Sequence, residues 1–210
     1  MRFKKVLAPL VGAFFLAVVT PSSAEDAASQ ILFTNVDVFD SRNAQVINGA
    51  NVLIQDNLIA EVTTEALTVD GATVIDGEGR MLVPGLIDGH NHIMLPGNPL
   101  ALAYNLHWSY IGALVTREAE AMLMRGFTTL RDAGGPCYGI AEAIDQDIVP
   151  GPRIFCSGHF IGQTSGHFDF RLYNETHPRQ RSERSFFETH WSFIADGVPE
   201  VRAMTREALR

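Results

Sequence analysis

Strand and helix patterns alternate along the chain after residue 84, and this order constrains the fold more than any other feature of the sequence. The predicted elements are a strand at 86–92, a helix at 116–125, a strand at 127–131, a helix at 139–146 and a strand at 153–156. Such alternation predicts βαβ units and a parallel sheet. Three strands cannot close a barrel, which typically takes about 250 residues. The segment is therefore expected to be a small open sheet or the first part of a larger barrel.

Residues 25–84 show short strand patterns separated by turn residues. The predicted strands are 31–39, 51–55, 58–62, 72–76 and 80–83. Asp56-Asn57 predicts a two-residue hairpin turn, and Gly77-Glu78-Gly79 predicts a second turn. We expect a small all-β unit in this part of the chain.

The first 24 residues are typical of a secretory signal peptide. Arg2, Lys4 and Lys5 precede an apolar run from 6 to 19, and small residues lead to a cleavage position after Ala24. The alternative is a membrane anchor, but a span needs roughly 20 apolar residues. The sequence therefore predicts an exported protein, periplasmic or secreted, that has no membrane partner after cleavage.

Charge and cysteine content exclude some functions. The net charge is −8 and becomes −11 when the three leader cations are removed, which argues against a nucleic-acid partner. Cys137 and Cys156 do not make a disulfide framework. We interpret them as two separate buried side chains, with a bridge as the alternative. Neither lies in a CxxC motif, and the sequence has no GxSxG motif, so cysteine and serine nucleophiles are not expected.

His90 and His92 are the strongest candidates for chemistry. They lie two residues apart at the end of a predicted strand, so their side chains share a face and can bind one ion. The carboxyl end of a barrel strand is also where such folds keep their active sites. With seven histidines in the chain, the spacing alone is weak, and structural histidines are the alternative. The preceding Pro84-Gly85 and Asp88-Gly89 favour metal binding.

Several motifs resemble the amidohydrolase superfamily. Pro84-Gly85-Leu86-Ile87-Asp88-Gly89-His90-Asn91-His92 resembles that superfamily's first barrel strand. The later matches are 126–135 to the second strand and its loop, 151–158 to the third strand, 165–167 to the following loop, and 196–210 to the next helix. The resemblance runs from about Ile31 to Arg210. It points to the imidazolonepropionase-like branch, which includes exported Xaa-Pro dipeptidases.

This resemblance implies an α/β fold with a (β/α)8 TIM barrel and a small β-sandwich built from both ends of the chain. It divides the chain into a signal peptide (1–24), the first part of the sandwich (25–84) and an incomplete barrel with three strands (85–210). The superfamily binds metal through two histidines on strand one, a carboxylated lysine, two further histidines and an aspartate. Only His90 and His92 have counterparts. The bridging lysine and the general-base aspartate are expected beyond Arg210, so no catalytic residue is assigned within the chain.

The implied function is hydrolysis of an amide, a cyclic amide or a dipeptide by metal-activated hydroxide. The ion is expected to be zinc, with one or two ions in a complete enzyme, and the partner is a small-molecule substrate. A homo-oligomer of the complete enzyme is compatible with this function. As an N-terminal fragment, the chain itself is expected to be inactive. The alternatives are a truncated chain with at most a binding role and, ranked last, metal sequestration by the histidine pair.

Other candidates carry less weight. His167 lies in the loop after the third strand and is a candidate for substrate binding. Arg131 is a candidate for binding a substrate carboxylate, although an ion pair with Asp132 is the favoured interpretation. The remaining histidines, His107, His159, His177 and His190, are expected at surface or satisfied positions.

Two features near the end of the sequence complete the prediction. Within the aromatic-rich segment 158–195, the stretch from Phe168 to Phe193 is either a lid over a pocket or a buried cluster, and the sequence does not decide between them. A helix is expected to begin at Pro199-Glu200, because apolar residues then recur at helical spacing.

Overall fold

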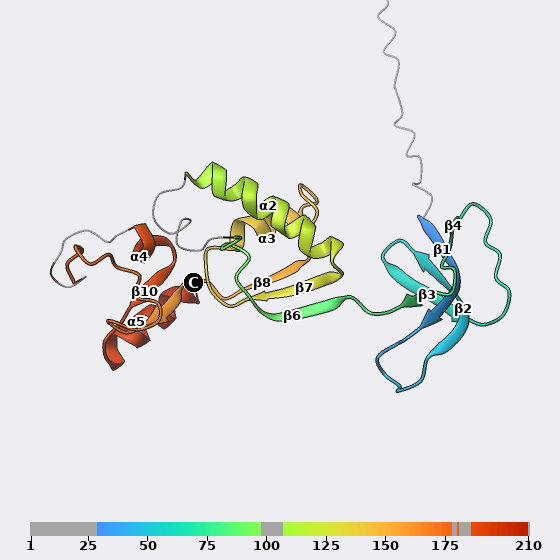
Figure 1. The fold of residues 1–210 in the computed structure, drawn as a ribbon, viewed down its shortest axis with the longest axis horizontal. Coiled ribbons are helices and arrows are strands. Elements are labelled where there is room, and N and C mark those ends of the chain that lie inside the picture. The colour runs from blue at the N-terminus through green and yellow to red at the C-terminus, as the bar shows by residue number, and fades with distance from the viewer. Residues whose placement is uncertain (1–28, 98–106, 178–179, 181–185, 210) are drawn as a thin grey trace, which may run out of the picture. The chain divides into compact units, whose positions relative to one another are not determined.

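The computed structural model describes residues 29–97, 107–177, 180 and 186–209. The expected signal peptide lies outside these residues. Within the described ranges, no helix is long and apolar enough to cross a membrane. The chain divides into two compact units, Met1–Leu82 and Val83–Arg210 (Figure 1).

The first unit contains a five-stranded sheet, which confirms the all-β prediction. Its strands are β1 (Gln30–Val38), β2 (Ile47–Gln55), β3 (Leu58–Thr63), β4 (Thr73–Asp76) and β5 (Met81–Leu82). The order is β3-β2-β1-β4, with β5 also paired to β1. Neighbours β1, β2 and β3 are antiparallel, whereas β4 and β5 run parallel to β1. The hairpin turn at Asp56-Asn57 is confirmed, because Gln55 pairs with Leu58 and Asp56 has a φ of 54°.

The second unit begins with a parallel sheet, as predicted. Its strands β6 (Leu86–Asn91), β7 (Phe127–Asp132) and β8 (Arg153–Cys156) lie in the order β6-β7-β8. The connecting helices are α2 (Trp108–Met124) and α3 (Tyr138–Asp145). Helix α2 begins at Trp108 rather than at the predicted residue 116. Its N-cap is His107, whose ring accepts a hydrogen bond from the amide of Ser109, and histidine is not one of the common capping residues.

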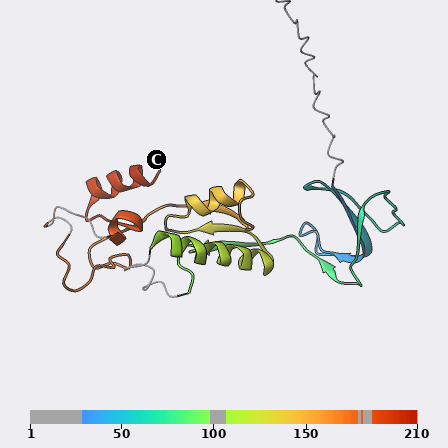
Figure 2. The same ribbon diagram turned by 90° about the horizontal axis from the view of Figure 1, so that it is seen from above.

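The two faces of this sheet differ. Leu130 of β7 is fully buried against Ile111, Val115 and Met122 of α2. Figure 1 shows α2 and α3 on the same side of the sheet, and Figure 2 shows them side by side from above. The register places Ile87, Thr129 and Arg153 together on the other face. Ile87 is 72% exposed there, so this face is uncovered in the described part of the chain.

The second unit ends with a smaller group of elements. These are β9 (Phe160–Gly162), α4 (Phe186–His190), β10 (Ser192–Ile194) and α5 (Val198–Ala208). Strands β9 and β10 form a parallel pair, and α5 confirms the predicted last helix. Phe187, Trp191 and Phe193 are buried, so these aromatic residues of the stretch 168–193 belong to a packed core rather than to a lid.

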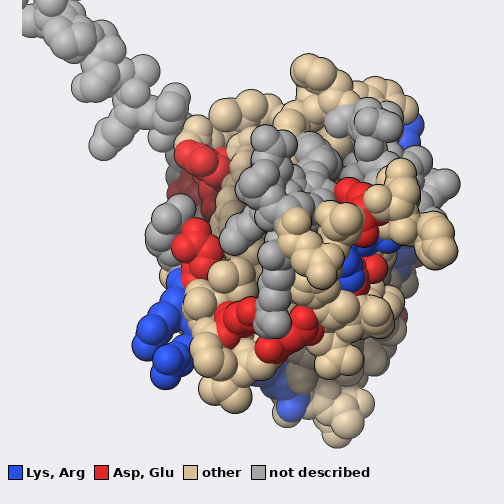
Figure 3. Space-filling view, turned by 90° about the vertical axis from the view of Figure 1, so that its left-hand side faces the viewer, with Lys and Arg blue, Asp and Glu red and all other residues tan. Residues whose placement is uncertain are grey.

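Charged side chains are dispersed on the surface. On the face shown in Figure 3, acidic and basic side chains lie in separate small groups among uncharged residues. The sequence as a whole has 24 acidic and 16 basic residues.

Candidate metal centre

The predicted histidine pair lies at the carboxyl end of β6. His90 is on the strand, and His92 follows its last residue, Asn91. The ring centroids are 5.2 Å apart, and the ring planes are nearly perpendicular at 84°. With Zn–N distances of about 2.0–2.1 Å and tetrahedral geometry, two imidazoles that share an ion have centroids roughly 5 Å apart. The pair therefore fits two ligand positions of one divalent ion.

The pair does not complete a metal site by itself. Among the residues that the structure describes, no group of three or more histidine, cysteine, aspartate or glutamate side chains is placed to hold a metal ion. A catalytic zinc normally has three protein ligands and one open position. The described residues thus supply only part of a catalytic ligand set.

A β-bulge sets the direction of His90. The pairing of β6 with β7 shifts between Asp88 and Asn91, where β6 has one residue more than its partner. Asp88 stabilises this shape by accepting hydrogen bonds from the side-chain amide of Asn91, at 2.9 Å, and from the backbone amide of His90, at 3.0 Å. These two hydrogen bonds lower the pKa of the Asp88 carboxyl below its usual value.

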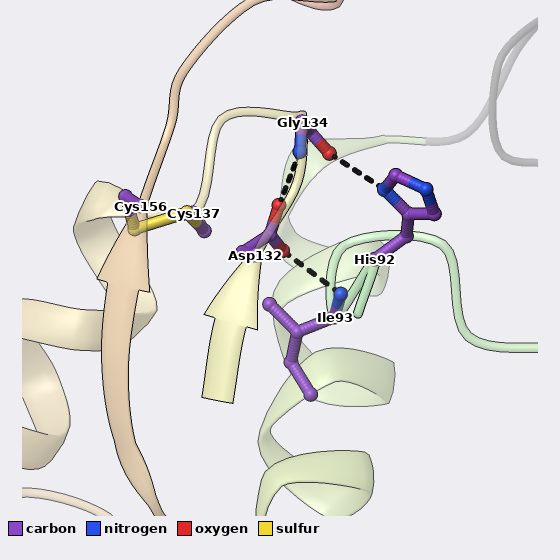
Figure 4. The surroundings of a disulfide bond; sticks show 6 residues. All are labelled: His92, Ile93, Asp132, Gly134, Cys137 and Cys156. Carbon is purple, nitrogen blue, oxygen red and sulfur yellow. Dashed lines mark hydrogen bonds between the residues drawn. A yellow bond between two sulfur atoms is a disulfide. The ribbon is translucent and has the colours of Figure 1, made fainter. Parts of the chain in front are cut away.

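Asp132, at the end of β7, links the histidine segment to the loop after β7. Its side chain is fully buried. One carboxylate oxygen accepts the amide of Ile93, directly after His92, at 2.9 Å, and the other accepts the amide of Gly134 at 2.9 Å (Figure 4). Burial raises the pKa of the Asp132 carboxyl, and the two hydrogen bonds oppose that rise only in part.

The ring of His92 is oriented by the same loop. Its Nδ1 atom lies 3.3 Å from the carbonyl oxygen of Gly134 (Figure 4). Because a carbonyl oxygen only accepts, a hydrogen bond at this contact requires the proton on Nδ1, and the neutral tautomer that has it there keeps the lone pair of Nε2 available to a metal ion. Metal-binding histidines commonly have such a backbone partner.

The favoured interpretation of Arg131 and Asp132 as an ion pair is wrong. Neighbouring residues on a strand point to opposite faces of the sheet, and Asp132 is buried while Arg131 is exposed. The guanidinium of Arg131 instead donates a hydrogen bond to the carbonyl of Gly89 at 3.1 Å. Arg131 therefore lies beside the histidine pair, and its role in binding substrate stays a prediction.

Two phenylalanine rings link His167 to the pair. The centroid of Phe160 lies 5.3 Å from that of His92, and Phe168 stacks on Phe160 at 4.3 Å. The ring of His167 lies 4.9 Å from that of Phe168, and its residue is exposed. The structure thus brings His167 to the same region, while its role in binding substrate also stays a prediction.

The other four histidines have contacts away from the pair, in agreement with the sequence. His107 caps α2, His159 stacks on Phe193, His177 contacts Thr164, and His190 meets Trp108 edge to face. Burial lowers the pKa of the His190 ring, and the nearby His159 adds to this effect.

Cys137 and Cys156 form a disulfide, which corrects their interpretation as separate buried thiols. Cys156 ends β8 and is paired in register with Asp132 at the end of β7. Cys137 lies in the turn after β7, and the two Cα atoms are 5.8 Å apart, within the usual range for a disulfide. The bridge therefore ties the loop that carries Gly134 to the neighbouring strand (Figure 4).

Sequence reasoning did not identify Gly134 or the role of Asp132. Both lie in the motif segment 126–135, so the signal was present, but a backbone carbonyl and a side chain bound to backbone amides leave no pattern of their own. The run Asp132-Ala133-Gly134-Gly135 indicated only a loop.

The family is shown by a direct match. The model of the Amidohydrolase family matches residues 81–210, which is more than half of the chain. The chain therefore belongs to the amidohydrolase family, as the sequence motifs suggested. Members of this superfamily generally depend on divalent metal ions.

Similar proteins are longer than this chain. The ochratoxinase of Aspergillus niger is 28% identical over 204 aligned residues, which cover 90% of this chain and 41% of the ochratoxinase. A solved amidohydrolase structure has 36% identity and a TM-score of 0.74, covering 86% of this chain and 44% of that protein. A prolidase solved with N-methylphosphonate-L-proline has 31% identity and a TM-score of 0.74, with coverage of 86% and 44%. The chain thus spans less than half the length of each.

Proposed function

We propose that this chain is the metal-binding N-terminal part of a hydrolase that cleaves C–N bonds. The observation that carries the proposal is the spacing of the His90 and His92 rings, 5.2 Å apart at the carboxyl end of a parallel strand. His90 and the Nε2 atom of His92 would bind a divalent ion, for which zinc is the expected choice because imidazole nitrogens suit it. The substrate class is an amide, a cyclic amide or a dipeptide.

The uncovered sheet face supports an incomplete (β/α)8 barrel. Ile87 and Phe155 project from that face and are 72% and 58% exposed. In a closed barrel, the face opposite the helices is filled by side chains from the other strands. The same proposal makes the five-stranded sheet of the first unit part of a β-sandwich, with the remaining strands contributed by polypeptide outside these 210 residues. The longer relatives are consistent with both parts.

The residues around the pair have separable roles in the proposed reaction. A bound divalent ion would supply a Lewis acid that activates water and polarises the scissile carbonyl. Asp88 shapes the bulge that directs His90, and Gly134 holds the proton of His92 on Nδ1. Arg131 is exposed beside the pair and would bind a substrate carboxylate, as a dipeptide or an N-acyl amino acid requires. His167 would contact the other end of the substrate.

A second candidate is a chain that binds a metal ion but does not catalyse hydrolysis alone. It is favoured by the absence, within the described ranges, of any cluster of three metal-binding side chains. The sequence has lysine only at positions 4 and 5, within the expected signal peptide, so the carboxylated lysine of the superfamily has no counterpart among the strands of either unit. The proposal therefore places hydrolytic activity in a longer polypeptide and metal binding in this chain. Export by the signal peptide at 1–24 is part of the same proposal.

Zinc titration of the 210-residue chain tests the proposal. We expect one weak zinc site by calorimetry, which His90→Ala or His92→Ala abolishes. His107→Asn is the matched control, because it removes a histidine while keeping a good N-cap for α2. Equal zinc binding by the double variant His90→Ala/His92→Ala would refute the assignment. In a longer polypeptide that hydrolyses N-acyl amino acids or dipeptides, the same two substitutions should abolish the activity.

A further inference from the structure

Four consecutive residues at the end of β7, 131–134, form hydrogen bonds with segment 89–93, which contains His90 and His92. The side chain of Arg131 donates to the carbonyl of Gly89, and the amide of Ala133 donates to the carbonyl of Asn91 at 2.8 Å. The carboxylate of Asp132 accepts the amide of Ile93, and the carbonyl of Gly134 accepts from His92. Residues 131–134 therefore hold segment 89–93, which contains both predicted ligands.

Asp132 has a special position among these four residues. It is the only one of the four whose side chain is buried, and it bonds Gly134 and the residue that follows His92. One of its oxygens fixes the residue after His92, and the other fixes the residue whose carbonyl accepts from the His92 ring. Asp132 therefore bonds Gly134 directly and reaches His92 through the backbone of the adjacent Ile93.

We infer that Asp132 is a positioning residue that locks His92 in the tautomer with its proton on Nδ1 and its Nε2 atom free for a metal ion. The inference rests on the proposed function for the identity of the ion. The hydrogen bonds of Asp132 and His92 do not depend on that function. Both oxygens of Asp132 are needed as acceptors, because they receive two backbone amides from different segments. An asparagine at this position has one acceptor oxygen and would oppose the second amide with its own donor.

The disulfide supports this role from the far side of the loop. Cys137 follows Gly134 by three residues, and its bridge to Cys156 fixes the end of the loop to β8. The loop is thus held at Asp132 and again at Cys137, and Gly134 lies between the two points. A carbonyl held at both sides can select one orientation of the His92 ring.

The test measures the tautomer of His92 and zinc affinity in the 210-residue chain. Long-range 1H–15N correlation spectra distinguish the two tautomers of a histidine without metal, and His92→Gln assigns the signal. In the wild-type chain we expect the Nδ1-protonated tautomer of His92. We expect Asp132→Asn to give a mixture of tautomers and a loss of zinc affinity of about 10- to 100-fold, and Asp132→Ala to have a larger effect. Asp145→Asn, which neutralises an exposed carboxylate at the end of α3, is the control and should leave both unchanged.

The possible results of these measurements each support or overturn the role of Asp132. A wild-type His92 with its proton on Nε2 would overturn it without any variant, so the inference remains testable if the Asp132 variants fail to fold. A folded Asp132→Asn chain that keeps the wild-type tautomer and zinc affinity would also overturn it. If the wild-type chain binds no zinc, the proposed function fails, whereas the tautomer measurement still tests the role of Asp132.

Discussion

The backbone of Gly134 packs directly against the ring of Phe160. A β-carbon at position 134 would lie 2.0 Å from Cε1 of Phe160, much closer than real contacts allow. Phe160 is buried, and its ring also contacts His92. The absence of a side chain at Gly134 therefore allows the loop, the phenylalanine and the predicted metal ligand to pack together.

Replacement of Gly134 by alanine should disturb this packing. We expect Gly134→Ala to lower the free energy of unfolding by about 1–3 kcal/mol, because an added methyl group forces Phe160 or the loop to move. Zinc affinity should fall as well, since the Gly134 carbonyl orients His92. Urea unfolding and zinc titration are the measurements. The control is Gly139→Ala in α3, where an added β-carbon meets nothing within 4 Å, and it should be neutral or stabilising. Equal stability of the two variants would contradict the expected clash.

Reduction of the disulfide should destabilise the second unit. The bridge joins residues separated by 19 positions, and a cross-link closing a loop of that length is typically worth roughly 3 kcal/mol. We expect the urea midpoint to fall when a reductant is added and to fall similarly in Cys137→Ser/Cys156→Ser. The double variant should then show no further response to reductant. Two free thiols detected by titration of the unreduced, folded chain would show that the bridge is not formed.

Truncation of Leu130 should open a cavity under α2. Its side chain is fully buried against Ile111 and Val115. We expect Leu130→Ala to cost about 2–5 kcal/mol, because both transfer and cavity terms act at such a site. Met124→Ala is the control, since Met124 is the last residue of α2 and is 79% exposed. A loss below about 1 kcal/mol in thermal or urea unfolding would contradict tight packing of the Leu130 side chain against α2.

The ion pair of Asp169 and Arg171 predicts a pH dependence at low pH. Arg171 donates to both carboxylate oxygens of Asp169, at 2.6 and 2.5 Å, and this interaction lowers the pKa of Asp169 from 3.8 to about 2. Because the folded-state pKa is depressed, the stabilisation is fully present above pH 3.8 and is lost as the pH falls through about 2. We expect the stability difference between wild type and Asp169→Asn to shrink over this interval. A difference that stays constant with pH would count against the pair.

Strands were predictable where the pattern and the turn residues are local. Asp56-Asn57 separates two segments of alternating residues, and the structure pairs these segments as β2 and β3. The three strands of the parallel sheet follow from the same kind of pattern. The short pair β9 and β10 was missed, because strands of three residues are too short to show a period.

The sequence predicted the two candidate metal ligands, but not the residues that orient them. His90 and His92 stand out by spacing, whereas the groups that orient them act through the backbone. Asp132 bonds an amide 39 positions earlier in the chain, and no local pattern indicates such a contact. The disulfide was missed for the same reason, since the separation of two cysteines does not reveal that the ends of β7 and β8 are neighbours.

The exposed side chains of Ile87 and Phe155 set a practical condition for work with this polypeptide. An apolar sheet face next to an open strand edge promotes aggregation of chains in solution. In the described part of the chain, β8 is such an edge strand. Dilute samples, or fusion to further polypeptide that covers this face, will therefore give more reliable titrations than concentrated preparations of these residues alone.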